Sequence, residues 1–457
     1  MPRPPTGPLR SAKDIAMPLS LKTLPTALLT GLLAFALAAA VLLIARGAGP
    51  HLPDRAAQER ALPSQPRPDA TTDQRIAAYQ AIVRARPQVA AGYTLLASSE
   101  LQKVRETGDA GYYTRAAATI DRGLGVAPGD LGLLTERGSL ALSRHDFRAG
   151  LADAERVHRA DPTLNRPYGV LVDALVELGR YDQAGRTLQE MVDRKPDLAA
   201  YSRVSYFREL HGDIPGARSA LMLAVSAGGA AAENVAYVQT LLGNLDLADG
   251  RLRAARDAYA QALFHFPGYA PARVGTARID AAHGREATAI RTLRSVVERL
   301  PLPEYVIALG DTELAAGRSA AARRDYALVG AEQRLLAASG VNTDTELALF
   351  QADHGSPPAG VRLARRAWSA APSVRSADAV GWTLLRSGHA REALPWARQA
   401  LRLGSRDAMF LFHAGMIARA AGRPDLARAW LRGALARNPR FSPLYAPRAR
   451  RALDGLS

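Results

Sequence analysis

Asp353 and His354 are the neighbouring residues best suited to proton transfer, since a carboxylate beside an imidazole can support general acid–base chemistry. A glycine-rich stretch from Gly123 through Gly125 to Gly129 is similar in composition to loops that bind phosphate groups. Its glycine spacing differs from that of nucleotide-binding loops, and no strand is predicted before it. Both stretches are also consistent with turns between helices, and the repeat described below favours that interpretation.

Several other kinds of site are excluded by residues that the chain lacks. The 457 residues include no cysteine, which excludes disulfides, thiolate zinc sites and cysteine nucleophiles. No two of the nine histidines stand three or four residues apart, so no helix face offers a pair of imidazole ligands. The motifs G-x-S-x-G and G-x-x-x-x-G-K do not occur. We therefore expect no catalytic, cofactor-binding or metal-binding residues, and a protein that is not an enzyme.

The elements that position the polar residues are predicted to be helices. Hydrophobic residues make up 48% of the chain, but aromatic residues only 6%. Much of the apolar content is alanine, which favours close-packed helices over sheets. The chain can therefore bury a large helical core.

The sequence repeats itself from about residue 71 with a period near 34 residues. Each unit reads as an apolar helix, a turn, an alanine-anchored second helix and, in most units, a closing proline. A small residue follows each turn after five positions. The turns fall at Gly111, His145, Gly179, Gly212, Gly250, Gly284, Gly317, Gly355, Gly388 and Gly422.

Each recurring feature of the unit has a physical reason. Glycine after the first helix can adopt the left-handed backbone conformation that ends a helix. The small residue lets the two helices approach closely, and proline stops the second helix. A single helix pair cannot bury its own apolar face, so neighbouring units must stack.

This pattern resembles the tetratricopeptide repeat, most clearly in residues 243–267 and 415–439. The resemblance covers residues 71–457 and implies an all-α fold: a right-handed α-solenoid of about ten helix pairs with terminal capping helices. Some units depart from the pattern. The first carries an insertion, His145 replaces the turn glycine of the second, and the unit around Gly317 continues into an extended helix.

The resemblance also implies a binding groove on the concave face, lined by the first helix of each pair. Trp382 and Arg386 stand four residues apart and share a helix face, so an exposed tryptophan beside an arginine could anchor a peptide. The alternative is that Trp382 fills the space between helices. Positions that match the ligand contacts of the family are Arg203, Tyr206, Asn244, Arg278, Asp311, Trp382, Arg386 and His413.

Residues 24–45 form an uncharged apolar run of 22 residues, long enough to span a bilayer as one helix. We expect a short basic cytoplasmic tail at 1–23, a transmembrane signal anchor at 24–45 and a proline-rich linker at 46–70. Basic residues before the run favour an extracytoplasmic location for the repeats of this single-pass protein. The alternative is a cleaved signal peptide and secretion.

The formal net charge of +16 is concentrated toward the C-terminus, where residues 316–457 hold 22 basic and 10 acidic groups.

Two functions fit the sequence. The favoured one is a scaffold or assembly factor at a bacterial membrane, which binds a partner protein or peptide in the groove. The alternative is binding of an anionic envelope polymer or lipid surface through the basic C-terminal third. Nucleic acid is a less favoured partner, because the membrane segment would remove this surface from the cytoplasm. An open solenoid surface offers no closed pocket, which further argues against an enzyme.

Overall fold

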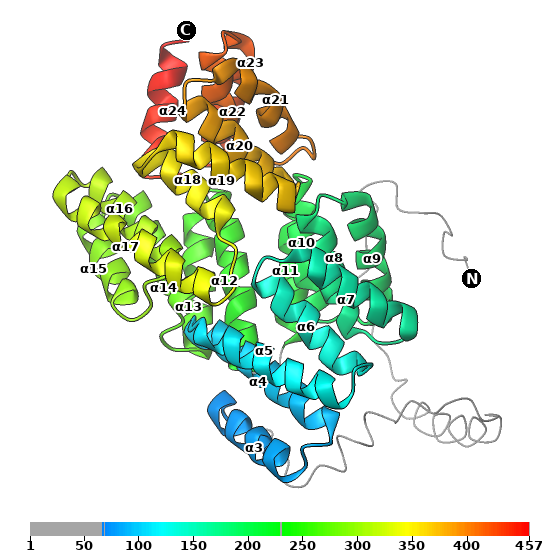
Figure 1. The fold of residues 1–457 in the computed structure, drawn as a ribbon. Coiled ribbons are helices and arrows are strands. Elements are labelled where there is room, and N and C mark those ends of the chain that lie inside the picture. Colours follow the sequence, from blue (N-terminus) through cyan, green and yellow to red (C-terminus); the bar gives the residue numbers. More distant parts are fainter. Residues whose placement is uncertain (1–65, 68, 229–230, 457) are drawn as a thin grey trace, which may run out of the picture.

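The computed structural model describes residues 66–67, 69–228 and 231–456, and within these residues it contains helices and no strand (Figure 1). One set of helices lies on the inner, concave side of the molecule. These are α4 (Ala90–Thr107), α6 (Leu131–Ser143), α8 (Arg166–Glu177), α10 (Leu198–Leu210), α12 (Ala232–Ala248), α14 (Ala270–Ala282), α16 (Pro303–Ala315), α18 (Asp344–His354), α20 (Val374–Arg386), α22 (Ala408–Ala420) and α24 (Tyr445–Asp454).

The remaining helices alternate with these along the chain, and each of them except α3 pairs with the inner helix before it. They are α3 (Thr72–Ala85), α5 (Gly111–Val126), α7 (Phe147–Ala160), α9 (Tyr181–Arg194), α11 (Ile214–Ala227), α13 (Leu252–His265), α15 (Glu286–Val297), α17 (Ser319–Ala338), α19 (Pro357–Ala370), α21 (Ala390–Ala400) and α23 (Pro424–Arg437). The predicted all-α solenoid of helix pairs is confirmed, and so is the extended helix after Gly317, which is α17.

The turns between paired helices use the left-handed conformation in eight of the ten predicted positions, including His145 with φ 59°. The predicted turn position is wrong at Gly111, whereas at Gly355 the turn is present but its backbone is not left-handed. In the first unit the left-handed residue is Gly108, with φ 69°, while Gly111 is already the first residue of α5. Gly355 has φ −137°, so α18 ends there without a left-handed turn. The insertion in the first unit explains the first error, because it moves the turn relative to the repeat.

Close helix packing in each unit depends on small residues facing large ones. Tyr259 of α13 is fully buried between Gly243 of α12 and Gly275 of α14. A Cβ atom on these two glycines would lie 2.5 Å and 2.2 Å from the tyrosine ring. The Tyr259 hydroxyl donates a hydrogen bond to Asn244 Oδ1 at 2.7 Å, so its polar end is satisfied at the inner surface.

The solenoid curves so tightly that its C-terminal half packs against its N-terminal half. Hydrogen bonds between the two halves join residues 191 to 223 positions apart in the sequence. Helix-pair turns of the first half meet loops between units of the second half along a line that we call the seam. Its contacts are Gly108 with Leu300, His145 with Asn342, Gly179 with Pro372, Gly212 with Gly404, and Gly250 with Asn438.

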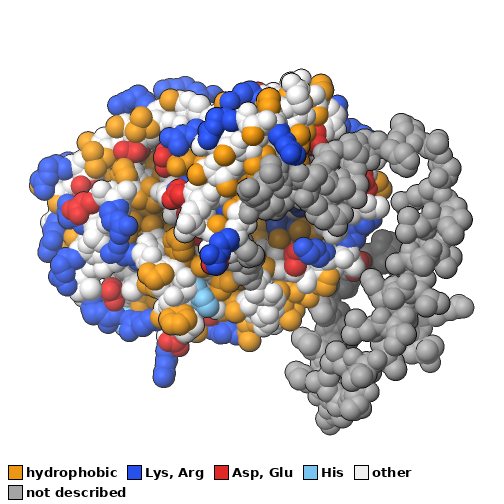
Figure 2. All heavy atoms as spheres, turned by 90° about the horizontal axis from the view of Figure 1, so that it is seen from below, with side chains coloured by type: hydrophobic (Ala, Val, Ile, Leu, Met, Phe, Trp, Pro, Cys, Tyr) orange, Lys and Arg blue, Asp and Glu red, His pale blue; other side chains and the backbone are white. Residues whose placement is uncertain are grey.

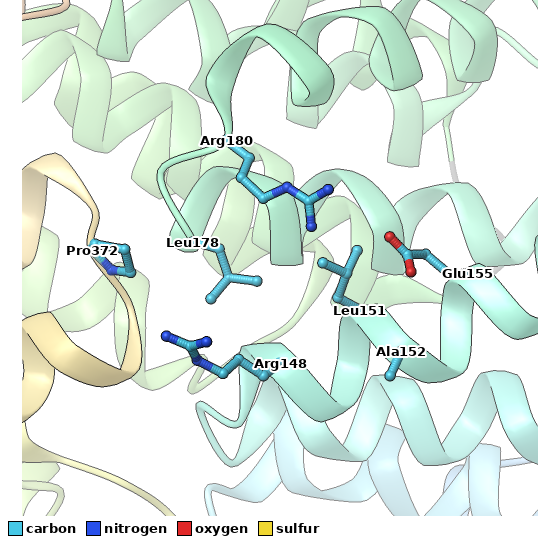
Figure 3. Close-up of a pocket in the computed structure, with 7 residues that line it drawn as sticks. All are labelled: Arg148, Leu151, Ala152, Glu155, Leu178, Arg180 and Pro372. Carbon is cyan, nitrogen blue, oxygen red and sulfur yellow. The ribbon is translucent and has the colours of Figure 1, made fainter.

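The middle of the seam is held by polar contacts. Arg148 donates to the carbonyl oxygens of Ser369 and Ala370 at 2.9 Å and 3.1 Å. The backbone N–H of Val374 donates to the Tyr181 hydroxyl at 2.9 Å. A pocket of about 380 Å³ opens beside these contacts (Figure 3). Figure 3 shows the residues that line it, with Pro372 facing the others across the seam: Arg148, Leu151, Ala152, Glu155, Leu178, Arg180 and Pro372.

The predicted tail at 1–23 and membrane segment at 24–45 lie outside the described residues, as does most of the predicted linker at 46–70. Among the helices that the structure describes, none combines the length and the apolar character needed to cross a membrane.

Candidate partner-binding site

The inner helices surround a cavity of about 1370 Å³, which we call the inner cavity. Its lining extends from Arg105 of α4 to Tyr445 of α24 and therefore involves almost the whole solenoid. The seam produces this shape, because it brings the two halves together around a shared interior. The cavity is deep but remains partly open to solvent, so the expectation that the solenoid has no closed pocket is not contradicted.

Two positions of the repeat supply much of the lining. One stands six residues before the turn, as Tyr206 stands before Gly212, and the other stands thirteen residues before it, as Tyr237 stands before Gly250. Both positions lie on the same face of the inner helix, because seven residues are about two helical turns. The predicted contact residues occupy the first of these positions and two others, nine and two residues before the turn.

Arg203 and Tyr206 of α10 line the cavity, as predicted from the repeat. Arg203 is held by Asp173 of α8 through two hydrogen bonds of 2.8 Å and 2.6 Å. The Tyr206 hydroxyl donates to Glu177 Oε1 at 3.2 Å. Burial and the Glu177 carboxylate raise the pKa of Tyr206, so the phenol stays protonated. The two side chains form an ordered polar surface between α8 and α10.

Asn244, Arg278 and Asp311 also line the cavity. Asn244 accepts the hydrogen bond from Tyr259, and Asp311 accepts one of 2.6 Å from the Tyr326 hydroxyl. Five of the eight predicted contact residues therefore surround one space.

The other three predicted residues, Trp382, Arg386 and His413, do not line the cavity. The Trp382 side chain is only 3% exposed, and its ring stacks on His413 with centroids 4.1 Å apart. Its indole N–H donates to Asp353 at 3.1 Å. The prediction of an exposed tryptophan anchor is wrong at this position, because α22 and α24 close over it. Trp382 instead fills the space between helices.

Arg386 and His413 both contact Trp382, Arg386 from the exposed surface and His413 from the buried core. Arg386 does share a helix face with Trp382, but its Nε donates to the Ala352 carbonyl at 3.0 Å. The buried His413 lies 2.8 Å from Asp378 through Nδ1. Burial opposes the charged imidazolium, but the Asp378 carboxylate outweighs it, and the pKa of His413 is raised.

Asp353 and His354 occupy the last turn of α18 and line the cavity. The imidazole Nε2 of His354 lies 3.1 Å from Asp311 Oδ1, and its ring stacks on Tyr326. The prediction that these residues form the turn between helices is wrong for both, because α18 continues through His354 and the turn begins at Gly355. Each side chain is occupied by structural partners rather than arranged around a free reactive group.

The carboxylates that the sequence analysis missed are a prominent feature of the lining. Glu209 of α10, Glu304 of α16 and Asp407, the N-cap of α22, all face the cavity. Burial and the nearby Asp407 raise the pKa of Glu209 to about 7. Burial likewise raises the pKa of Glu304, with a further contribution from Glu346. The interior therefore holds negative charge that the surrounding protein solvates poorly.

We expect Glu209→Gln to stabilise the fold at pH 8 by about 1–3 kcal/mol and to have little effect at pH 4. The folded-state pKa of Glu209, about 7, lies above its ordinary value of 4.5. Folding therefore loses stability as pH rises from the ordinary value toward 7, and the amide removes that loss. Chemical unfolding at both pH values measures the difference. Glu190→Gln, at an exposed site on α9, is the control, and an equal gain there would contradict the assignment.

Comparison with known proteins supports the repeat. Tetratricopeptide-repeat family models match residues 246–311 and residues 380–441. No curated protein matches the sequence. The chain thus contains tetratricopeptide repeats, a repeat type that generally forms protein–protein interaction scaffolds and is typically non-enzymatic.

Solved structures with a similar arrangement are distant in sequence. The APC/C hetero-tetramer Cut9-Hcn1 matches at 18% identity over 84% of this chain and 67% of that chain, with a TM-score of 0.36. A thermophilic TPR protein of Thermus thermophilus matches at 22% identity over 40% of this chain and 98% of that chain, with a TM-score of 0.36. The human IFIT1 dimer with PPP-AAAA matches at 14% identity over 80% of this chain and 86% of that chain, with a TM-score of 0.44.

Proposed function

We propose that this tetratricopeptide-repeat protein is a non-enzymatic scaffold or assembly factor that binds a segment of a partner protein in its inner cavity. The observation that carries the proposal is the cavity itself, since the inner helices of nearly all units contribute to one lining. Its volume of about 1370 Å³ exceeds the roughly 300–1,000 Å³ of small-molecule pockets. A polypeptide segment is the ligand that suits such a space.

The proposed contact residues are Arg203, Tyr206, Asn244, Arg278 and Asp311. Four of them donate or accept hydrogen bonds or ion pairs within the lining, so their positions are set before a partner arrives: Arg203, Tyr206, Asn244 and Asp311. Ordered side chains lose little conformational entropy on binding, which favours affinity. Apolar side chains such as Leu241 and Ile307 lie among them and can bury the aliphatic parts of a partner.

The proposed place of action is the outer face of a bacterial membrane. This part of the proposal rests on the apolar run at 24–45, which would anchor the protein with its repeats outside the cytoplasm. The proline-rich residues after it would hold the solenoid away from the bilayer.

Photo-crosslinking in cells tests the binding site. Tyr237 of α12 lines the cavity and is 44% exposed, while Phe264 of α13 is 78% exposed and does not line it. Each is replaced in turn by benzoylphenylalanine, which keeps an aromatic ring at both positions. We expect the Tyr237 replacement to yield a discrete protein adduct after irradiation, and the Phe264 replacement to yield none.

An adduct only at Phe264, or none at Tyr237, would contradict binding in the cavity.

The basic C-terminal third favours a second candidate function, binding of an anionic envelope polymer or lipid surface, because it holds 22 basic and 10 acidic groups. In that case the captured material would be polymer or lipid, and salt would release it, because such association rests on screened charge.

A further inference from the structure

The inner cavity has the opposite charge from the chain as a whole. Nine carboxylates and six arginines line it, although the chain carries a net charge of +16. Figure 2 shows Lys and Arg side chains along much of the outline of one face of the molecule. The fold thus sorts basic residues toward the outside and gathers an excess of acidic residues inside.

Some of the lining charges are already balanced by neighbours. Arg203 pairs with Asp173 through two short hydrogen bonds. Glu233 accepts hydrogen bonds from Tyr269 and Gln102, with Arg105 3.9 Å away. These groups form a neutral part of the lining.

Two pairs of lining carboxylates repel each other, although each pair also has a favourable contact. The Glu346 carboxylate lies 3.9 Å from Arg375, and Asp407 Oδ1 accepts hydrogen bonds from the backbone N–H groups of Met409 and Phe410. Glu209 of α10 interacts unfavourably with Asp407 of α22, and Glu304 of α16 with Glu346 of α18. The carboxylates of each pair come from different helices, so the seam and the helix stacking place like charges together. Bringing a cation between them would relieve the repulsion and restore the solvation lost on burial.

Arg375 of α20 shows how the lining accommodates such a cation. Its side chain is 51% exposed, and because it lines the cavity we take this exposure to be toward the interior. The guanidinium lies 3.9 Å from Glu346 and interacts with Tyr206 and Glu177. These partners come from the inner helices α8, α10 and α18. The same type of group on a partner would meet similar surroundings at the two carboxylate pairs.

From this arrangement we infer that the inner cavity selects a partner segment rich in lysine or arginine, whose cationic groups lie between Glu209 and Asp407 and between Glu304 and Glu346. The inference rests on the proposed function and adds the chemical class of its ligand. Tyr237 offers an aromatic face to a cation, and the apolar side chains cover the aliphatic stems. A nucleic acid would bring phosphates toward an excess of carboxylates and be repelled.

Fluorescence anisotropy with the full-length protein tests the inference. The probe is a short labelled peptide in which lysines alternate with alanine and serine, and matched peptides carry glutamate or glutamine in place of every lysine. We expect the lysine peptide to bind and the glutamate peptide not to bind. The double variant Glu209→Gln/Glu304→Gln should weaken binding of the lysine peptide at least about tenfold. Glu190→Gln/Glu298→Gln removes two exposed carboxylates and should leave binding unchanged.

A second variant gives a change in the opposite direction. Arg375→Gln removes the internal cation that competes for the same carboxylates, so the lysine peptide should bind more tightly. A general loss of folding would weaken binding in both cavity variants, and thermal melts of each identify such a loss. Opposite changes in two folded variants would support the inference directly.

Equal binding of the lysine and glutamine peptides would overturn the inference, as would preferential binding of the glutamate peptide or of an oligonucleotide. Failure of every peptide to bind, with a protein adduct still formed at Tyr237, would overturn the charge preference alone. Absence of that adduct together with failure of all peptides would overturn the proposed function as well.

Discussion

Replacing Gly212 by alanine should destabilise the protein by about 2–5 kcal/mol, whereas the same change at Gly317 should cost only about 1–2 kcal/mol. The two glycines have nearly the same backbone conformation, with φ 74° and 75°. A new Cβ atom at Gly212 would lie 2.3 Å from the Gly404 carbonyl oxygen across the seam. At Gly317 it would meet nothing within 4 Å.

The difference in unfolding free energy between the two variants gives the contribution of the seam contact, because the contribution of the turn is common to both. Both variants place alanine in the unfavourable left-handed conformation. Only Gly212→Ala must also displace the backbone around Gly404. Chemical unfolding of the full-length proteins measures the two costs, and amide exchange in the loop that contains Gly404 reports whether the seam has opened. Equal destabilisation of the two variants would mean that the seam contributes nothing at this turn.

Trp382→Ala should lower the free energy of unfolding by about 3–5 kcal/mol, as expected for a large aromatic side chain removed from a packed core. The indole is 3% exposed and packs near Phe412, His413 and Tyr445. Its loss would leave a cavity beneath α24. We therefore expect the effect to appear as a lower unfolding midpoint, measured by denaturant titration.

Trp382→Phe is the matched control for this effect. It keeps an aromatic ring against His413, but it removes the hydrogen bond from the indole N–H to Asp353 and part of the ring volume. We expect a loss of about 1–3 kcal/mol, in the range for a hydrogen bond to a charged group. If Trp382→Ala left stability unchanged but abolished capture of the partner, Trp382 would be a binding anchor and the structural assignment would fail.

The fold could be predicted from the sequence because each unit carries its own local signals. Glycine at the turn and small residues between helices, such as Gly243 beside Tyr259, report contacts within a unit or with the next one. The position six residues before the turn identified Tyr206, Asn244 and Asp311 as residues of the concave face. These contacts depend on helix geometry alone, and helix geometry is periodic.

The seam could not be predicted in this way. Its contacts join residues about 190 positions apart, and their existence depends on the small rotation between successive units accumulated over half the chain. The seam deepens the groove into a cavity that is partly open to solvent, and its lining includes both Glu209 and Asp407. The same limit explains Trp382, because a repeat position that faces the groove elsewhere is covered here by α24, which ends the array.

The seam also restricts how the gene for this protein can change. Solenoids ordinarily gain or lose whole units, because each unit contacts only its neighbours. Here Gly179 must meet Pro372 and Gly212 must meet Gly404, so one unit added or deleted between them would bring every turn against the wrong loop. The number of repeats is thus fixed by the closure of the superhelix, and variation is confined to the ends of the array and to substitutions within units.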